Sequence, residues 1–475
     1  MSEVLEYPVG RRPEASPKVS VTRVFMITTV AALGGFLFGF DTAVINGTIG
    51  ALQTTFNAGS WALGLCVSSA LIGSAVGAFF AGRLADRFGR TRSMMIASGL
   101  FAISALGSGF AFSLWDLGLW RLVGGVAIGG ASVVAPTYIA EIAPAHLRGR
   151  LGSLQQMAIV VGIFVALLGD YALAAGAGSA ANLYWLDFAA WRWMFWTGVP
   201  PALLYGLGAL IIPESPRYLV AKGREREALN VLRETLGAAA PLRLVEVRAS
   251  LRAYKPARLP DLKGPRVGLL PVVWVGIVLA VLQQLVGINV IFYYSSVLWQ
   301  AVGFSEHDSL LITVITSITN ILTTLIAIAF VDRIGRKPLL LVGSLGMALT
   351  LGTLALLFAT APLDAQGNPV LQGTVGMVAL VAANLYVVFF GFSWGPVVWV
   401  LLGEMFPNRI RAVALSLAAM AQWVANFLIT ATFPVLARAG LGWAYGLYTT
   451  AAVFSVFFTW FWIRETKGRE LEQMG

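Results

Sequence analysis

The chain consists mainly of apolar stretches of about 20 residues, separated by short polar segments. An α-helix of that length crosses roughly 30 Å of hydrocarbon, because each residue adds about 1.5 Å along the helix axis. A transmembrane β-barrel would instead show segments of about 10 residues with alternating polarity. The pattern therefore predicts an all-α integral membrane protein with about twelve spans, at residues 23–48, 61–82, 93–113, 116–140, 151–174, 192–212, 268–300, 307–331, 338–360, 374–403, 410–435 and 443–463.

The predicted spans fall into two halves that are separated by a polar linker. Within the linker, Arg224–Leu236 has apolar residues on one side and charged residues elsewhere, which predicts an amphipathic helix. The pattern leaves open whether that helix is solvated or packs against the ends of the halves. We expect a cytoplasmic N-terminal tail, a six-helix half, a cytoplasmic helical linker, a second six-helix half and a cytoplasmic C-terminal tail, at 1–22, 23–212, 213–266, 267–463 and 464–475.

Charged phrases recur in the two halves. The phrase Asp-Arg-x-Gly-Arg occupies 86–90 and returns at 332–336. A second phrase, Glu-x-x-Pro-x-x-x-Arg, begins at Glu141 and again at Glu404. Two halves that repeat both the hydropathy pattern and the charged motifs indicate a duplication. In membrane proteins this organisation favours a transporter whose substrate site lies between the halves.

Glycines at helical spacing predict close packing between spans. The chain contains 51 glycines. Gly73 and Gly77 lie four residues apart on one helix face, and so do Gly125 and Gly129. Small residues at this spacing let two helix backbones approach closely in lipid.

The composition agrees with a membrane protein and explains the net charge. Charged residues are 12% of the chain, against about 25% in soluble domains. With both termini in the cytoplasm, nearly all Lys and Arg fall on the cytoplasmic side, and the exceptions are Arg121, Arg192 and Arg438. This distribution obeys the positive-inside rule and predicts a multi-pass protein of the plasma (bacterial inner) membrane. The net charge of +10 follows from topology, so no nucleic-acid partner is expected.

The sequence lacks the motifs that an enzyme of this size would be expected to show. It contains no phosphate loop of the type G-x-x-x-x-G-K-[ST] and no Cys/His cluster with metal-ligand spacing. Its one cysteine, Cys66, lies in an apolar segment, so no intramolecular disulfide forms. We therefore expect no enzymatic activity, no metal and no cofactor.

Seven motifs in order along the chain resemble the sugar porters of the major facilitator superfamily. The phrase Gln-Gln-x-x-Gly-Ile-Asn and the phrase Pro-Glu-Ser-Pro-Arg narrow the resemblance to sugar transport. One departure is Arg464, where the family usually carries a proline. The resemblance implies the major facilitator fold and a protein that works as a monomer in the lipid bilayer. The motifs lie at 82–90, 121–125, 141–150, 213–217, 283–289, 332–337 and 403–407.

Amides in the seventh span could bind a neutral polyol. A sugar needs side chains that donate and accept hydrogen bonds, and an aromatic ring to cover its C–H face. Gln283, Gln284 and Asn289 lie near the middle of the span, and Gly287 would permit a break there that exposes the backbone. In the eleventh span, Gln422 and Asn426 share one helix face. The alternative is that such amides only bridge helices.

The resemblance adds further residues to this site. Ile163 matches a position that is glutamine in relatives preferring xylose and isoleucine in glucose transporters, which favours a hexose. Asn426 is expected to line the cavity. The positions that hold the sugar in relatives are matched by Gln156, Gln283, Gln284, Asn289, Asn320, Trp399 and Trp423.

Energy coupling is expected at Asp41, which lies deep in the first span. An ionised acid inside a span costs about 2.5–3.5 kcal/mol on insertion scales, so it is a functional candidate. Arg121 lies at a compatible depth in the fourth span. The resemblance agrees, because proton-coupled sugar porters carry this pair. The alternative for this pair is a static salt bridge. For the protein as a whole, the alternatives to proton symport are an uncoupled uniporter and a transporter-like sugar sensor.

Charged residues at the cytoplasmic ends of the spans are expected to form a gate. They could pair between helices when the inside is closed, and inward opening would break the pairs. Exposed pairs contribute only about 0–1 kcal/mol each, so several would have to act together. The alternative is that they only set the topology. The gate residues are Asp86, Arg90, Glu141, Arg148, Glu214, Asp332, Arg336, Glu404, Arg411 and Glu465.

Overall fold

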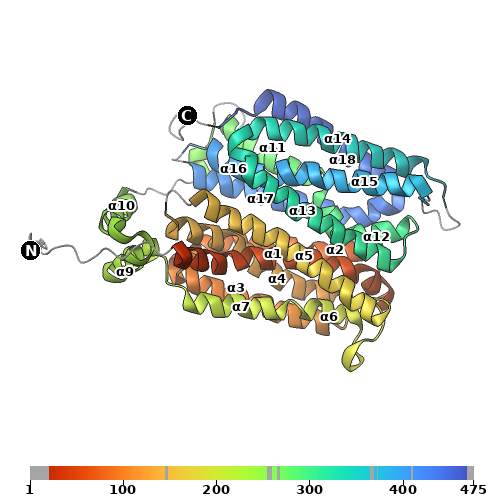
Figure 1. The fold of residues 1–475 in the computed structure, drawn as a ribbon, viewed down its shortest axis with the longest axis horizontal. Coiled ribbons are helices and arrows are strands. Elements are labelled where there is room, and N and C mark those ends of the chain that lie inside the picture. Colours follow the sequence, from red (N-terminus) through yellow and green to blue (C-terminus); the bar gives the residue numbers. More distant parts are fainter. Residues whose placement is uncertain are drawn as a thin grey trace, which may run out of the picture.

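The structure is a computed structural model that describes residues 21–144, 148–253, 259–264, 268–363, 369–371, 373–407 and 410–467. Within these residues, 12 helical segments are long and apolar enough to cross a membrane. They coincide with the predicted spans, so the prediction of an all-α membrane protein is confirmed. Figure 1 shows the helices side by side in one elongated bundle, with the first half below and the second half above.

The first half contains seven helices that make six of these segments, because α6 and α7 together form one. The first helix extends beyond the predicted end of its span to Thr55. The helices are α1 (Val21–Thr55), α2 (Ser60–Phe88), α3 (Arg90–Phe110), α4 (Leu114–Ile142), α5 (Arg148–Ala177), α6 (Ala190–Trp196) and α7 (Val199–Ile211).

The linker forms three short helices, α8 (Pro216–Ala221), α9 (Glu225–Leu236) and α10 (Ala240–Ala253). Figure 1 shows α9 and α10 at one end of the bundle, which we call the linker end. The predicted amphipathic helix is therefore confirmed as α9. Val231 and Leu232 on this helix are buried, and Glu234 pairs with Arg23 of α1 at 2.9 Å. The helix packs against the first half instead of being solvated on all sides.

The second half repeats the arrangement with two interrupted spans. A π-helical turn, η5, separates α15 from α16. The elements are α11 (Pro271–Leu285), α12 (Ile288–Ala301), α13 (Glu306–Ile334), α14 (Arg336–Thr360), α15 (Gly373–Phe389), η5 (Phe390–Trp394), α16 (Gly395–Met405), α17 (Arg411–Ala439) and α18 (Leu441–Trp462).

The break that the sequence predicts at Gly287 is present. Gly287 adopts φ 84°, a left-handed conformation that favours glycine, and separates α11 from α12. The break leaves backbone groups without helical partners in the hydrocarbon region. The hydroxyl of Tyr386 donates to the carbonyl oxygen of Val286 at 2.7 Å and satisfies one of them.

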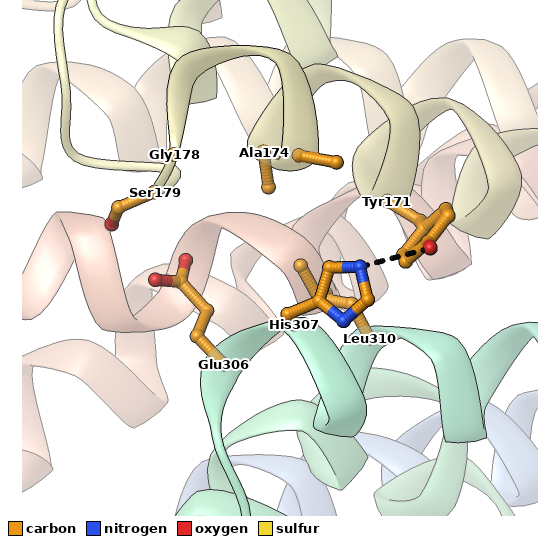
Figure 2. A pocket seen from close by; sticks show the side chains of 8 residues that line it. Tyr171, Ala174, Gly178, Ser179, Glu306, His307 and Leu310 are labelled. Atoms are coloured by element: carbon orange, nitrogen blue, oxygen red, sulfur yellow. Dashed lines mark hydrogen bonds between the residues drawn. The ribbon is translucent and has the colours of Figure 1, made fainter.

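Among the described residues, the recorded hydrogen bonds between the halves gather at the end of the bundle opposite the linker, which we call the far end. The Asn46 side chain of α1 donates to Ser295 Oγ of α12 at 3.0 Å. Figure 2 shows the neighbouring contact, in which Tyr171 of α5 lies 3.0 Å from His307 Nε2 of α13. Beside it, Glu306 accepts the N–H of Ala180 at 2.9 Å. These bonds close the far end.

The glycines of α2 and α4 allow the close approach that the sequence predicts. A Cβ at Gly125 would lie 2.0 Å from the carbonyl oxygen of Ala70, and one at Gly73 would lie 2.1 Å from that of Leu122. Backbone atoms cannot move away as a flexible side chain can. Glycine at these positions is therefore a condition for the packing of α2 against α4.

We expect Gly125→Ala to destabilise the protein by about 1–3 kcal/mol, because the methyl group overpacks the contact between α2 and α4. Thermal unfolding in detergent would measure the loss. Gly130→Ala on the same helix is the matched control, since a Cβ there meets nothing within 4 Å. Equal melting temperatures for the two variants would contradict the packing argument.

Candidate functional site

Asp41 and Arg121 form a buried ion pair between α1 and α4. Arg121 is 1% exposed and Asp41 is 7% exposed. The two Nη–Oδ distances are 3.3 and 3.4 Å, longer than the roughly 2.7–2.9 Å of a strong charge-assisted hydrogen bond. Arg121 Nε has no hydrogen-bond partner among the described residues. The guanidinium is thus held loosely, and Asp41 is its recorded counter-charge.

Four amides form a hydrogen-bonded chain around the break at Gly287. The side chain of Gln422 on α17 donates to Gln283 Oε1 at 2.8 Å. Gln284 donates to the same oxygen at 3.4 Å, and Asn289 donates to Gln284 Oε1. The structure therefore brings together the three predicted amides of the seventh span with Gln422.

The amide chain is anchored to the π-helical turn of the tenth span. Gln283 Nε2 donates to the carbonyl oxygens of Trp394 at 2.7 Å and Gly395 at 3.2 Å. The sequence gives no sign of this partner, because a backbone carbonyl becomes available only through the local helix geometry. Gln422 Oε1 is buried without a partner among the described residues, so it is available to accept a hydrogen bond from a ligand hydroxyl group.

The other predicted sugar residues lie apart from this chain. The Trp423 ring packs against Phe38 of α1 at 5.7 Å between ring centroids, so aromatic groups of the two halves meet there. Asn426 accepts a hydrogen bond from Thr430 of its own helix at 3.1 Å. Asn320 is buried beside the π-helical turn, where a Cβ at Gly391 would lie 3.3 Å from its Oδ1.

Gln156, Ile163 and Trp399 complete the predicted set. Gln156 is half-buried and Ile163 is buried, both on α5 in the first half. Trp399 on α16 is 41% exposed. Among the described residues, no recorded hydrogen bond joins these three side chains to the amide chain.

A charged network joins the linker-end helices of the first half. The guanidinium of Arg90 donates two hydrogen bonds to Glu141, both at 3.0 Å. Its third nitrogen lies 3.2 Å from Asp86. Glu214 accepts the backbone N–H groups of Arg90 at 2.9 Å and Thr91 at 3.3 Å, and so satisfies the start of α3.

The second half contains the same network with the same roles. Arg336 donates to Glu404 at 3.0 and 2.7 Å. Glu465 accepts the N–H groups of Arg336 and Lys337, both at 3.0 Å, at the start of α14. Thr466 bonds to Glu404 as Ser215 bonds to Glu141. The duplication therefore extends to individual hydrogen bonds.

These pairs join helices of one half, and they are formed while the far end is closed. Between the described parts of the two halves, no hydrogen bond is recorded at the linker end. Arg411 donates to the carbonyl oxygen of Phe406 at 3.2 Å, and its Nη2 has no partner among the described residues. The side chains of Arg148 and Asp332, two other predicted gate residues, lie outside the described residues.

Glu465 is a strong hydrogen-bond acceptor in this network. Burial alone would raise the pKa of its carboxyl group. The backbone N–H groups of Lys467, Arg336, Lys337 and Thr466 outweigh burial and hold the pKa below its ordinary value. The ionised carboxylate therefore stabilises the first turn of α14.

Comparison with known proteins identifies the family. The family model described as "Sugar (and other) transporter" matches residues 27–475. The chain is 59% identical to the "Glucose transport protein" of Synechocystis sp. over 97% of this chain and 100% of the relative. It is 38% identical to the "D-xylose-proton symporter" of Escherichia coli, with 95% of each chain covered.

Solved structures of similar shape include the xylose transporter XylE from E. coli. Its inward open conformation matches with a TM-score of 0.80 at 37% identity, covering 95% of this chain and 99% of that chain. Its partially occluded inward open conformation gives 0.81 at 37% identity, covering 94% and 100%. The same proton:xylose symporter bound to 6-bromo-6-deoxy-D-glucose gives 0.77 at 37% identity, covering 95% and 98%.

We expect Glu214→Ala and Glu465→Ala each to destabilise the protein by about 0.5–2 kcal/mol, because each removes the acceptor for a helix start. Chemical unfolding of the purified protein would measure the loss. Because the pKa of Glu465 is lowered, its contribution is complete at neutral pH and disappears as the pH falls through that pKa. The difference between parent and Glu465→Ala should therefore shrink in acid.

The control for this prediction is Glu246→Ala, which removes an exposed pair with Arg243 on α10. A surface pair of that kind contributes about 0–1 kcal/mol. Losses no larger than that of Glu246→Ala would show that the carboxylates do not cap the helices.

Proposed function

The chain belongs to the sugar transporter family of the major facilitator superfamily, and from that premise we propose that it imports a monosaccharide together with protons. Its family and relatives are transporters, not enzymes. The observation that carries the proposal is the amide chain around Gln283, which lies where two interrupted spans meet. Such a group of donors and acceptors suits a neutral polyol.

We propose that the sugar is a hexose such as glucose. The relative named as a glucose transport protein supports this choice, as does the brominated glucose bound by the xylose symporter. Ile163 supplies a buried apolar surface at the position where relatives that prefer xylose carry a glutamine. A pentose is the competing substrate, because loss of one hydrogen bond can alter selectivity strongly or hardly at all.

We place the linker end of the bundle in the cytoplasm and the far end outside, in a bacterial inner membrane. The excess of Lys and Arg near the linker end supports this orientation. It puts both termini in the cytoplasm. We propose that one chain in the lipid bilayer is the working unit, because each half already carries a complete charged network and the proposed site lies between the halves of one chain.

In this orientation the closed far end makes the structure inward-facing. Alternating access would open the far end by separating α1 from α12 and α5 from α13. We propose that the two charged networks hold the cytoplasmic ends of each half together as it moves. Arg148 and Arg411 follow the recurring glutamates at equal spacing, so we propose them as the residues that reach across the cytoplasmic gap when it closes.

Proton coupling would use the buried pair of Asp41 and Arg121. Protonation of Asp41 removes the counter-charge of Arg121 and lets α1 move relative to α4. The long distances in the pair favour such an exchange over a permanent bridge. Uncoupled uniport is the second candidate function, and it would leave the pair as a static contact.

We expect Gln283→Ala to weaken binding of the best sugar several-fold or more, because a buried hydrogen bond contributes about 0.5–1.5 kcal/mol and its partners would remain unsatisfied. Equilibrium binding of labelled sugars to the purified protein would measure this. Asn384→Ala is the control, since that amide bonds to the Leu380 carbonyl of its own helix and to the Thr316 hydroxyl of α13, and no recorded hydrogen bond joins it to the amide chain. Unchanged affinity in both Gln283→Ala and Gln284→Ala would remove these amides from the site.

We expect Asp41→Asn to abolish accumulation of sugar driven by a pH gradient in proteoliposomes, because the amide cannot carry a proton. Exchange of labelled for unlabelled sugar should continue, since the neutral side chain imitates the protonated acid. Asp308→Asn, which changes an exposed acid at the start of α13, is the control. Accumulation by Asp41→Asn, or uptake by the parent without alkalinisation of the medium, would favour uniport.

A further inference from the structure

A second carboxyl group is buried in the first half, and the proposed proton pathway through Asp41 does not use it. Asp170 on α5 is 1% exposed, and its Oδ2 accepts the N–H of Gly47 on α1 at 3.1 Å. Its Oδ1 is buried and has no hydrogen-bond partner among the described residues. An acid inside a span is a functional candidate by the same rule that draws attention to Asp41.

The surface of α1 is shaped to receive this carboxyl group. A Cβ at Gly47 would lie 2.6 Å from the Cβ of Asp170, so the contact requires glycine. Gly39, two turns earlier on α1, approaches the carbonyl oxygen of Ile159 in the same way. The two glycines bring the backbones of α1 and α5 together along their length. Asp170 is therefore sealed from water as long as these helices remain in contact.

Asp170 also lies on the face of α5 that carries the proposed sugar residues. Gln156, Ile163 and Asp170 follow one another at intervals of seven residues, which is close to two helical turns. Asp170 is about 10 Å beyond Ile163 along the helix axis, toward the far end. If the protein transports sugar as proposed, this places the carboxyl on the extracellular side of the site.

Asp170 binds Gly47, which directly follows Asn46, the α1 residue whose contacts close the far end. Asn46, which precedes Gly47, donates to Ser295 Oγ and to the carbonyl oxygen of Phe292, both at 3.0 Å. Its Oδ1 accepts the N–H of Ser296 at 3.1 Å, and its backbone oxygen accepts the Ser296 hydroxyl at 2.7 Å. Movement of this part of α1 would break these bonds to α12 and would also expose Asp170.

No recorded ion pair compensates a charge on Asp170 within the described residues. An ionised carboxylate without a counter-charge is far more costly to bury than a protonated one. The closed structure therefore requires the neutral acid. The titratable or charged groups on α5 and on the elements packed against it near this end are Asp41, Asp116, Arg121, Tyr171, Arg192, Glu306, His307 and Asp308, and no recorded hydrogen bond or ion pair joins any of them to the Asp170 carboxyl.

We propose that Asp170 is a second proton-binding site, which takes up a proton when the extracellular side closes and releases it to external water when that side opens. The proposal rests on the transport function proposed above. Because closing binds a proton, closing becomes less favourable as the external pH rises. Asp170 would thus make the extracellular gate sensitive to protons independently of the pair at Asp41.

The protonation of Asp170 can be measured without any sugar. Infrared spectra of the full chain in lipid vesicles at neutral pH should contain the C=O band of a protonated buried carboxyl group. Asp170→Asn should remove that band, while Asp308→Asn should leave it in place. The asparagine keeps an acceptor for the Gly47 N–H, so the fold is expected to persist. A parent spectrum without the band, or an unchanged band in Asp170→Asn, overturns the proposal.

The consequence for transport can be measured after the first proton site is removed. In Asp41→Asn, exchange of labelled glucose at equal pH on both sides should still become slower from mildly acidic to mildly alkaline pH. In Asp41→Asn combined with Asp170→Asn, the dependence on pH should be lost. The proposal is overturned if the exchange rate still depends on pH in the double variant. It is also overturned if the rate of Asp41→Asn alone no longer depends on pH. If no variant and no parent exchanges sugar, the proposed function fails, and the infrared band still decides the role of Asp170.

Discussion

Hydrocarbon around the bundle tolerates a broken helix or a charged side chain only where another part of the protein compensates it. The seventh span breaks at Gly287, and the Tyr386 hydroxyl satisfies the carbonyl oxygen that the break exposes. The tenth span changes to a π-helical turn, and Gln283 binds the carbonyl oxygens at its end. Each irregularity is therefore matched by a polar side chain of the other span. The amide chain exists because these two compensations occur at the same level of the bundle.

The same constraint shapes the ends of the helices. At the linker end a helix start exposes N–H groups, and in each half a glutamate from the segment after the last span accepts them. That glutamate lies beside an arginine that is bound by a second glutamate. Because the recorded bonds of each network, among the described residues, stay within one half, they stiffen that half without tying it to the other half. Two stiff units whose recorded hydrogen bonds to each other lie at the far end are suited to rotate about a central site.

The sequence was sufficient to predict the features that depend on local chemistry. Twelve spans follow from apolar length, the break at Gly287 from glycine among apolar residues, and α9 from its amphipathic pattern. It did not predict the π-helical turn at Phe390–Trp394, because residues around it would also suit a continuous helix. It also could not show that Gln283 binds a backbone oxygen of that turn, since such a partner depends on tertiary packing. The charged residues of the repeats were identified, but only the structure shows that the recorded pairs form within each half.

The division of chemistry between the halves gives coupling a physical basis. The amide chain belongs entirely to the second half, whereas Asp41, Arg121 and Asp170 all belong to the first. In the proposed mechanism, a sugar held by the amides would influence the acids by drawing the halves together, for example where Trp423 meets Phe38 of α1. Phe38 belongs to α1, the helix that also carries Asp41 and Gly47, the glycine that binds Asp170. Helix α1 carries Asp41, bonds to Asp170 through Gly47, packs on Trp423 through Phe38 and makes the closing contact at Asn46. A small movement of this one helix therefore changes the environment of all of these groups together. Coupling then requires no chain of specific residues between the sites, only that α1 has one position when the acids are protonated and another when they are not.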